Sequence, residues 1–347
     1  MALTLICTWS LTIEDKAVEP RNYIEGIICR VAGFCAATER KTVIVSCGPV
    51  LKEIISSVAY LQLHEFIEIT DVTGTDMTGK YSLVVEPKFR AVLVAVDSAQ
   101  TMIKVGRLCA GYQEAGVPVV VITGWNPPVD ANFFSQARRS NTGNLTTAGM
   151  FDLAATYCTG GTRGDIFEFG TFQGFTLQCA YHAFNGRNRA DNRRFIAFDS
   201  FSGVIGVKDG EAYKDGDFTT SEESLRFSNF LAEVPDEKVI IINGPYAKTL
   251  FSNADNTRQR LEPVEAAAIV HIDCDVEEPA RLALNFVTPY LKQGSLLLFD
   301  DYDGHHADNT KGERGALRGW LRENTDFEVE PYRCYHAGAR SFIVHKR

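Results

Sequence analysis

The sequence predicts an α/β protein built from mostly parallel β-sheets with helices packed around them. Short apolar runs rich in β-branched residues alternate with segments whose apolar residues recur every three or four positions. This alternation is typical of strands that are connected through helices. The length of 347 residues exceeds that of an average domain, so we expect two domains.

Composition places the chain among ordinary globular proteins. Hydrophobic residues make up 45% of the chain and charged residues 23%. The formal net charge of -9 argues against a general nucleic-acid binder, because no long basic footprint is available. The first residues have no basic region before an apolar stretch, and no apolar run reaches the length of a membrane span. We therefore expect a cytoplasmic protein that does not associate with membranes.

The nine cysteines are scattered and form no C-x-x-C pair. Most of them lie among apolar neighbours, which is typical of small buried side chains in a reducing compartment. We assign no chemistry to any of them.

Residues 1–125 are predicted to form a small Rossmann-like domain. Its only glycine turn of note, Cys47-Gly48-Pro49, supplies one glycine where a dinucleotide-binding loop needs three. No ligand is therefore assigned, and a docking or dimerisation role, which would make the protein a homodimer, is equally well supported. Strands are expected at 42–46, 66–72, 91–96 and 119–123, and helices at 20–37, 50–61 and 98–113.

Residues 126–148 have the composition of a linker. Asn126-Pro127-Pro128 and the polar run from Ser140 to Asn144 interrupt any regular apolar pattern. We place the domain boundary here and assign residues 149–347 to a second domain. Its first elements are expected to be a helix at 149–157, a strand at 165–169, a helix at 176–184, a strand at 194–198, a long loop at 201–218 and a strand at 238–242.

The first strand of this second domain is followed by a possible cofactor-binding turn. Gly170 lets the backbone turn and lets a ligand lie against it, and Gly174 allows the next helix to approach the strand. Glu168 places a carboxylate at the end of the strand, and Asp199 ends the next strand, where it can accept hydrogen bonds from ribose hydroxyls. This spacing favours S-adenosylmethionine over NAD, because the former has no pyrophosphate to bind.

Two acidic pairs follow the next two strands of this domain. Asp273 and Asp275 come after the apolar run 266–272, and Asp300 and Asp301 come after the run 295–299. A helix with apolar residues at helical spacing is expected between the runs, and Gly294 is expected to end it. The ends of neighbouring parallel strands lie at one edge of the sheet, so four carboxylates are expected to share one small space. Carboxylates crowded in this way favour a hard cation such as Mg²⁺.

The last part of the chain is predicted to complete the sheet. His305 and His306 lie in a polar loop at the same edge, where they are either solvated or in contact with substrate. A helix near 317–321 precedes two short strands at 327–332 and 341–344, which are expected to pair as a hairpin and to add an antiparallel strand.

Four segments give the second domain a family resemblance. They are IFEFGTFQGFT, FIAFDSFSG, HIDCD and LLLFDDYDG, in that order. With them, residues 149–345 resemble the class I S-adenosylmethionine-dependent methyltransferases, and within that class the macrocin O-methyltransferase family, which methylates sugar hydroxyls in natural-product biosynthesis. The resemblance implies a Rossmann-like sheet that is mostly parallel, with an antiparallel strand added last. It does not extend to the residues before Gly149.

The resemblance also implies roles for individual residues. Mg²⁺ would be bound by Asp273, Asp300 and Asp301, and Asp275 would be the general base. The methyl donor would be bound by Glu168, Gly170, Gly174, Thr176, Asp199, Ser200 and Phe201.

We therefore predict a Mg²⁺-dependent O-methyltransferase that acts on a hydroxyl of a sugar or glycosylated small molecule. One alternative is a metal-dependent glycosyltransferase, because Asp273-Cys274-Asp275 is a D-x-D sequence. It leaves Glu168 and Asp199 without a role. Another alternative is a protein without catalytic activity, in which the first domain senses a nucleotide and the second docks a partner.

Overall fold

The computed structural model describes most of the chain from residue 113 onwards and three earlier strands. The helices that we expected at 20–37, 50–61 and 98–113 lie outside the described residues, apart from Gln113. The described residues are 113, 116–123, 128–138, 145–186, 193–205, 207, 214–336 and 338–347, together with strands β1 (Val43–Ser46), β2 (Glu65–Glu68) and β3 (Val92–Val96).

The first sheet has four parallel strands in the order β2-β1-β3-β4, where β4 is Val119–Thr123. All four strands were predicted. Of the second, which was predicted at 66–72, the structure describes Glu65–Glu68.

The chain divides into two compact units that alternate along the sequence. Helix α8 (Glu222–Leu231) belongs to the first unit although residues of the second unit precede and follow it in the chain. Within that unit the Ser224 hydroxyl accepts a hydrogen bond of 2.8 Å from the Val119 backbone N–H of β4. The first unit consists of Met1–Phe133, Gln173–Phe175 and Phe218–Glu233, and the second of Phe134–Phe172, Thr176–Asp217 and Val234–Arg347.

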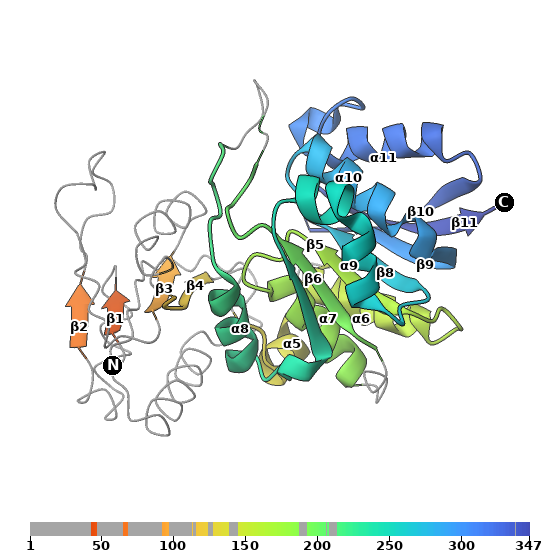
Figure 1. Cartoon of the computed structure of the whole chain (residues 1–347). Helices are drawn as coiled ribbons and strands as arrows, with labels where there is room; N and C mark the ends of the chain where they lie inside the picture. The colour runs from red at the N-terminus through yellow and green to blue at the C-terminus, as the bar shows by residue number, and fades with distance from the viewer. Residues whose placement is uncertain are drawn as a thin grey trace. The chain divides into compact units, whose positions relative to one another are not determined.

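The second unit contains a seven-stranded sheet in the order β10-β11-β9-β8-β5-β6-β7 (Figure 1). Strands β5 to β9 run parallel, and β11 is antiparallel to both β9 and β10. The predicted sheet and its final hairpin are therefore confirmed. The strands are β5 (Asp165–Phe169), β6 (Phe195–Asp199), β7 (Val239–Asn243), β8 (Ala267–Ile272), β9 (Leu291–Phe299), β10 (Phe327–Tyr335) and β11 (Ala339–Lys346).

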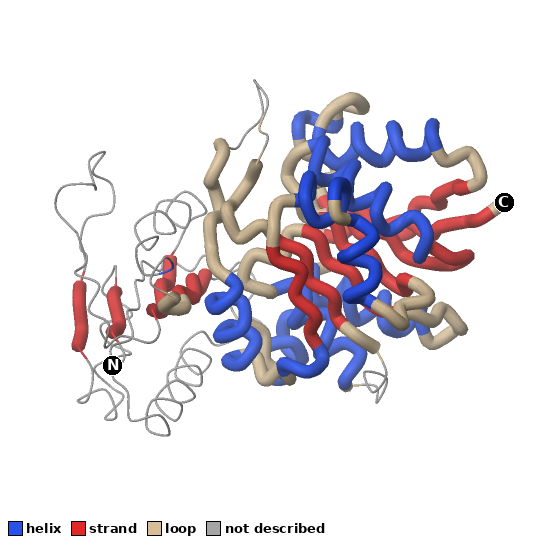
Figure 2. Tube along the Cα trace, viewed as in Figure 1, coloured by secondary structure: helices blue, strands red, loops and turns tan. Residues whose placement is uncertain are grey.

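Helices cover both faces of this sheet (Figure 2). On one face Val270 and Ile272 of β8 pack with Leu284 of α10 and Trp320 of α11 in one apolar cluster. On the other face the His271 ring packs edge-on against Phe151 of α6, because successive side chains of a strand point to opposite faces. The described helices of the second unit are α5 (Ala131–Ala137, of which residues 134–137 belong here), α6 (Thr147–Cys158), α7 (Phe175–Asn185, from residue 176), α9 (Ala254–Leu261), α10 (Glu277–Val287) and α11 (Gly312–Glu323).

Two local predictions differ from the structure. Helix α10 ends at Val287, and Gly294 lies inside β9 instead of ending the helix. Its φ of +84° and the shift in pairing between β8 and β9 form a bulge, in which a residue without a side chain is favoured. The segment predicted as a linker contains helix α5.

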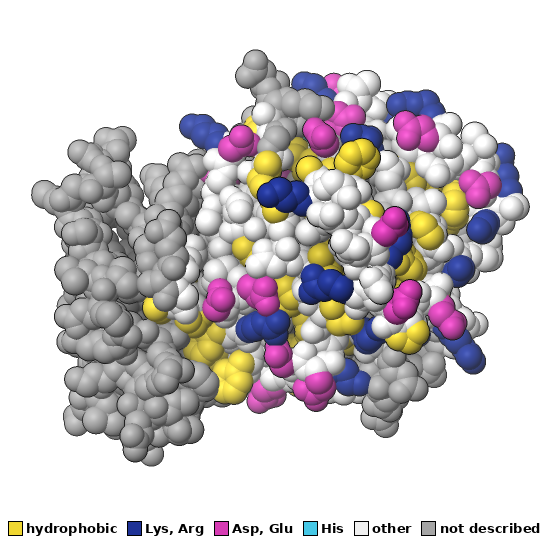
Figure 3. All heavy atoms as spheres, viewed as in Figure 1, with side chains coloured by type: hydrophobic (Ala, Val, Ile, Leu, Met, Phe, Trp, Pro, Cys, Tyr) yellow, Lys and Arg dark blue, Asp and Glu magenta, His cyan; other side chains and the backbone are white. Residues whose placement is uncertain are grey.

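No helix among the described residues is long and apolar enough to cross a membrane. On the face drawn in Figure 3, basic and acidic side chains of the described residues are interspersed.

Candidate active site

Three of the predicted acidic residues form a compact cluster at the carboxyl edge of the second sheet. Asp273 and Asp275 follow β8, and Asp301 follows β9. One carboxylate oxygen from each lies within 4.8 Å of the other two. The apolar strands β8 and β9 are parallel neighbours, so burying them brings these loops together.

Asp300 lies nearby but faces histidines. Its Oδ1 is 2.9 Å from His336 Nε2, in the turn between β10 and β11, and 3.7 Å from His271 Nε2. The second distance is too long for a hydrogen bond, so His336 is the closer partner. Of the predicted metal ligands, Asp273 and Asp301 thus lie in the cluster, with Asp275 in the third position, and the role of Asp300 stays a prediction.

The charges in the cluster oppose one another. Burial raises the pKa of Asp273 well above its usual value, and the nearby Asp300, Asp275 and Asp301 raise it further. The pKa of Asp301 is also raised, by burial and by Asp300. For Asp300, burial is outweighed by its histidine partners, which lower its pKa. Among the described residues no Lys or Arg pairs with Asp273 or Asp301, so a bound cation would relieve the repulsion.

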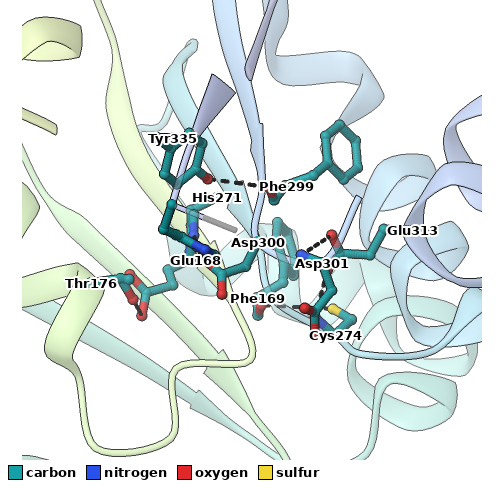
Figure 4. Close-up of polar contacts among 11 residues, drawn as sticks. Glu168, Phe169, Thr176, His271, Cys274, Phe299, Asp300, Asp301, Glu313 and Tyr335 are labelled. Carbon is teal, nitrogen blue, oxygen red and sulfur yellow. Dashed lines mark hydrogen bonds and ion pairs between the residues drawn. The ribbon is translucent and has the colours of Figure 1, made fainter. Parts of the chain in front are cut away.

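A second polar group lies at the end of β5. Glu168 is buried, and its Oε1 accepts a hydrogen bond of 3.0 Å from the Thr176 hydroxyl of α7 (Figure 4). Its Oε2 is buried and has no hydrogen-bond partner within the described part of the chain. Burial raises the pKa of Glu168 well above its usual value. An unpartnered buried carboxylate oxygen is suited to accept a ligand hydroxyl or ammonium group.

Asp199 ends β6 as predicted, and its carboxylate holds two turns in place. Oδ2 accepts a 2.7 Å hydrogen bond from the Phe172 backbone N–H, and Oδ1 accepts one of 2.7 Å from the Phe201 N–H. Burial raises the pKa of Asp199, against these backbone donors, which lower it. The Ser200 hydroxyl contacts the backbone of its own turn, where it accepts from the Ser202 N–H. These residues shape the edge of the sheet beside Glu168.

Gly170 lies directly against the loop after β8, and its predicted contact with the donor stays a prediction. Its φ is +86°, and a Cβ atom there would lie 1.6 Å from the Asp273 carbonyl oxygen. The loop after β8 therefore fills the place that a side chain would take, which requires a glycine here. Gly174 directly precedes α7 with a φ of +84°, a conformation that glycine adopts without strain.

The loop after Asp301 reaches back to the cluster. His305 Nε2 lies 3.2 Å from the Asp275 carbonyl oxygen, so this histidine contacts the backbone of a predicted site residue. Asp275 has a φ of +60°, and His305, His306 and Ala307 have φ values of +52°, +56° and +57°. Left-handed conformations cost energy in residues other than glycine and cluster at functional sites.

Three residues at this edge were not singled out from the sequence. Glu313 of α11 contacts both acidic loops through their backbone, as described below. His336 contacts Asp300, and the buried His271 has two ring nitrogens without a hydrogen-bond partner among the described residues. His271 could have been found from the sequence, because it is an ionisable residue inside the apolar run AAIVHI. No local sequence pattern pointed to Glu313 or His336, because their contacts are with residues distant in the sequence.

The strand order and the acidic strand ends give the second unit the fold of a class I methyltransferase, as the resemblance implied. In agreement with this, residues 167–302 match a family model that describes a methyltransferase domain. Residues 167–302 therefore match a methyltransferase domain, and the resemblance to the class I methyltransferases is confirmed at that level. Comparison with curated protein sequences gives no match.

Several solved structures are similar to the chain. The O-methyltransferase NovP shares 19% identity, with 71% of this chain and 97% of NovP covered and a TM-score of 0.47. CalS11, a TDP-rhamnose 3′-O-methyltransferase of calicheamicin biosynthesis, shares 21% identity over 56% of this chain and 78% of its own, with a TM-score of 0.41. An O-methyltransferase from Bacillus cereus shares 12% identity over 71% and 98%, with a TM-score of 0.40.

Proposed function

We propose that this protein is a Mg²⁺-dependent O-methyltransferase that transfers the methyl group of S-adenosylmethionine to a hydroxyl of a sugar or glycosylated small molecule. The observation that carries the proposal is the cluster of Asp273, Asp275 and Asp301. It lies at the same edge of a methyltransferase sheet as the buried acid Glu168, which is on the neighbouring strand β5. The sugar acceptor is proposed from the sequence resemblance.

The donor is proposed to lie along the ends of β5 and β6. Glu168 has a buried oxygen available for a hydroxyl or ammonium group of the donor. Asp199, Ser200 and Phe201 form the adjoining turn, which would face its ribose and adenine. Thr176 is proposed to act through Glu168, because its hydroxyl holds one of the two carboxylate oxygens.

The cation is proposed to bind Asp273 and Asp301, with Asp300 or Asp275 completing the protein ligands. The donor set fits Mg²⁺, because all these atoms are carboxylate oxygens and repel one another without a cation. When bound, such a cation lowers the pKa of a coordinated hydroxyl. The backbone N–H of Asp273 donates to Phe169 O at 2.9 Å, which fixes the loop after β8 to the end of β5.

Asp275 is proposed as the general base. In the reaction an acceptor oxygen attacks the methyl carbon, the bond from carbon to sulfur breaks, and the hydroxyl proton moves to the Asp275 carboxylate. The left-handed backbone of Asp275 and the contact of its carbonyl with His305 support a fixed orientation. General-base catalysis typically contributes about 10²- to 10⁴-fold in rate.

Calorimetry and mass spectrometry would test the proposal. We expect S-adenosylhomocysteine to bind the full chain, methyl transfer to a panel of glycosides to require a divalent ion, and Asp275→Asn to slow transfer about 10²- to 10⁴-fold. Stabilisation by UDP-sugars in place of S-adenosylhomocysteine would instead indicate a glycosyltransferase. Transfer at the wild-type rate by Asp275→Asn would remove the proposed base.

A further inference from the structure

Glu313 lies where the two acidic loops meet α11. It is in the first turn of that helix and is fully buried. Its Oε1 accepts a hydrogen bond of 3.1 Å from the Cys274 backbone N–H, and its Oε2 accepts one of 2.9 Å from the Asp301 N–H (Figure 4). One carboxylate therefore connects the loop after β8 with the loop after β9.

The two N–H groups belong to the residues that carry the cluster. Cys274 lies between Asp273 and Asp275, and Asp301 is itself a member. A carboxylate is planar and rigid, so the distance between its two oxygens fixes how far apart the two loops can move. Any change at Glu313 is thus transmitted to the spacing of the carboxylates that would hold a cation.

This arrangement has an electrostatic cost. Burial raises the pKa of Glu313 well above its usual value, and Asp301 raises it further, while the two backbone donors lower it. A neutral side chain in place of Glu313 would avoid placing a fourth carboxylate beside the three of the cluster, but it would bind only one of the two loops. Only a carboxylate offers an acceptor to both N–H groups at once, because a glutamine has a single acceptor oxygen.

We infer that Glu313 is a positioning residue for a divalent cation, and that it sets the affinity of the acidic cluster by holding the loops after β8 and β9 at a fixed separation. This inference rests on the proposed function, since it takes the cluster to be a cation site. Groups that orient metal ligands typically change metal affinity by about 10- to 100-fold when they are replaced.

The full chain can be titrated with Mn²⁺ and followed by electron paramagnetic resonance, which measures free ion and does not depend on turnover. We expect Glu313→Gln to bind Mn²⁺ about 10-fold or more weakly than the wild type, because it keeps the shape of the side chain and loses one of the two acceptors. Its affinity for S-adenosylhomocysteine should be unchanged, since Glu313 does not contact the proposed donor residues. Mn²⁺ affinity equal to that of the wild type would overturn the inference.

The matched control is Glu278→Gln. Glu278 lies in the first turn of α10, as Glu313 does in α11, but it is exposed. The control removes the same charge without touching the acidic loops, so we expect its Mn²⁺ affinity to stay within about twofold of the wild type. An equal loss in both variants would attribute the effect to net charge and would also overturn the positioning role.

A second variant covers the case in which Glu313→Gln does not fold. Glu313→Asp keeps the charge but is one methylene shorter, so it cannot reach both N–H groups. We again expect weaker Mn²⁺ binding than in the wild type. Mn²⁺ affinity equal to that of the wild type would contradict the inference. Failure of the wild type to bind Mn²⁺ would refute the proposed cation dependence, and with it this inference. Binding by the wild type with no loss in either variant would refute the positioning role alone.

Discussion

Acidic side chains at the two edges of the seven-stranded sheet have different partners. At the amino edge, Asp165 at the start of β5 accepts hydrogen bonds from the Arg194 backbone N–H at 2.9 Å and from its guanidinium at 2.8 and 3.1 Å. At the carboxyl edge, Asp273 and Asp301 are near other carboxylates, and no Lys or Arg among the described residues pairs with them. At the first edge the carboxylate is paired with a guanidinium, whereas at the second the described residues of the cluster leave the carboxylates beside one another.

This contrast predicts the largest effect for a change in the acidic cluster. Asp301→Asn removes one ligand charge, so we expect Mn²⁺ affinity to fall at least about 100-fold and methyl transfer to fall with it. The protein without metal should become more stable, because a mutual repulsion is removed. Mn²⁺ titration and thermal unfolding with and without the ion measure both effects. Unchanged Mn²⁺ affinity would remove the distinction between the two edges.

The opposite outcome is expected at the amino edge. Asp165→Asn leaves the Arg194 guanidinium without its carboxylate, and we expect the free energy of unfolding to fall by about 2 kcal/mol, as for a hydrogen bond to a charged group. Mn²⁺ affinity should not change, since Asp165 lies at the other end of β5 from the cluster. Chemical denaturation gives the first quantity, and loss of Mn²⁺ binding in this variant would show that the two edges are coupled.

Glu168 is predicted to show a smaller effect that depends on pH. Its pKa is raised in the folded protein, so the folded state binds more protons than the unfolded state between the usual glutamate value of 4.5 and the raised value. Wild-type stability should therefore fall as pH rises through this window, and Glu168→Gln should not show this fall. At neutral pH we expect the variant without ligand to be more stable by about 1 kcal/mol.

Binding of the donor provides the control for this prediction. Glu168→Gln should bind S-adenosylhomocysteine more weakly than the wild type, because the ligand loses a charged acceptor. Denaturation curves at several pH values and calorimetry at neutral pH test the two parts separately. Parallel pH profiles for the two proteins would show that Glu168 is not a source of instability in the free protein.

The sequence predicted the main elements of the second sheet because its strands are short, apolar and buried on both faces. The predicted strand at 165–169 matches β5, and the acids at the ends of β8 and β9 lie together as expected for parallel neighbours. Helix α8 was not expected, since its packing against β4 depends on contacts distant in the sequence.

The details of the acidic cluster were less predictable. Asp275 joins the cluster through a left-handed turn after β8, which no local sequence signal indicated. Asp300 faces His336 because the turn between β10 and β11 folds back to the same edge. Such contacts are set by the tertiary fold. The spacing of the aspartates therefore predicted that carboxylates gather at this edge of the sheet better than it predicted the partner of each carboxylate.

The absence of a side chain at Gly170 has a mechanical consequence. The Asp273 carbonyl occupies the place where a Cβ atom would lie, and the Asp273 N–H donates to Phe169 O at 2.9 Å. The end of β5, which carries Glu168, and the start of the Asp273 loop are thereby joined backbone to backbone. These contacts hold the two segments together at one point, so an acceptor hydroxyl bound beside Asp273 and an adenosyl group bound beside Glu168 would share one backbone support.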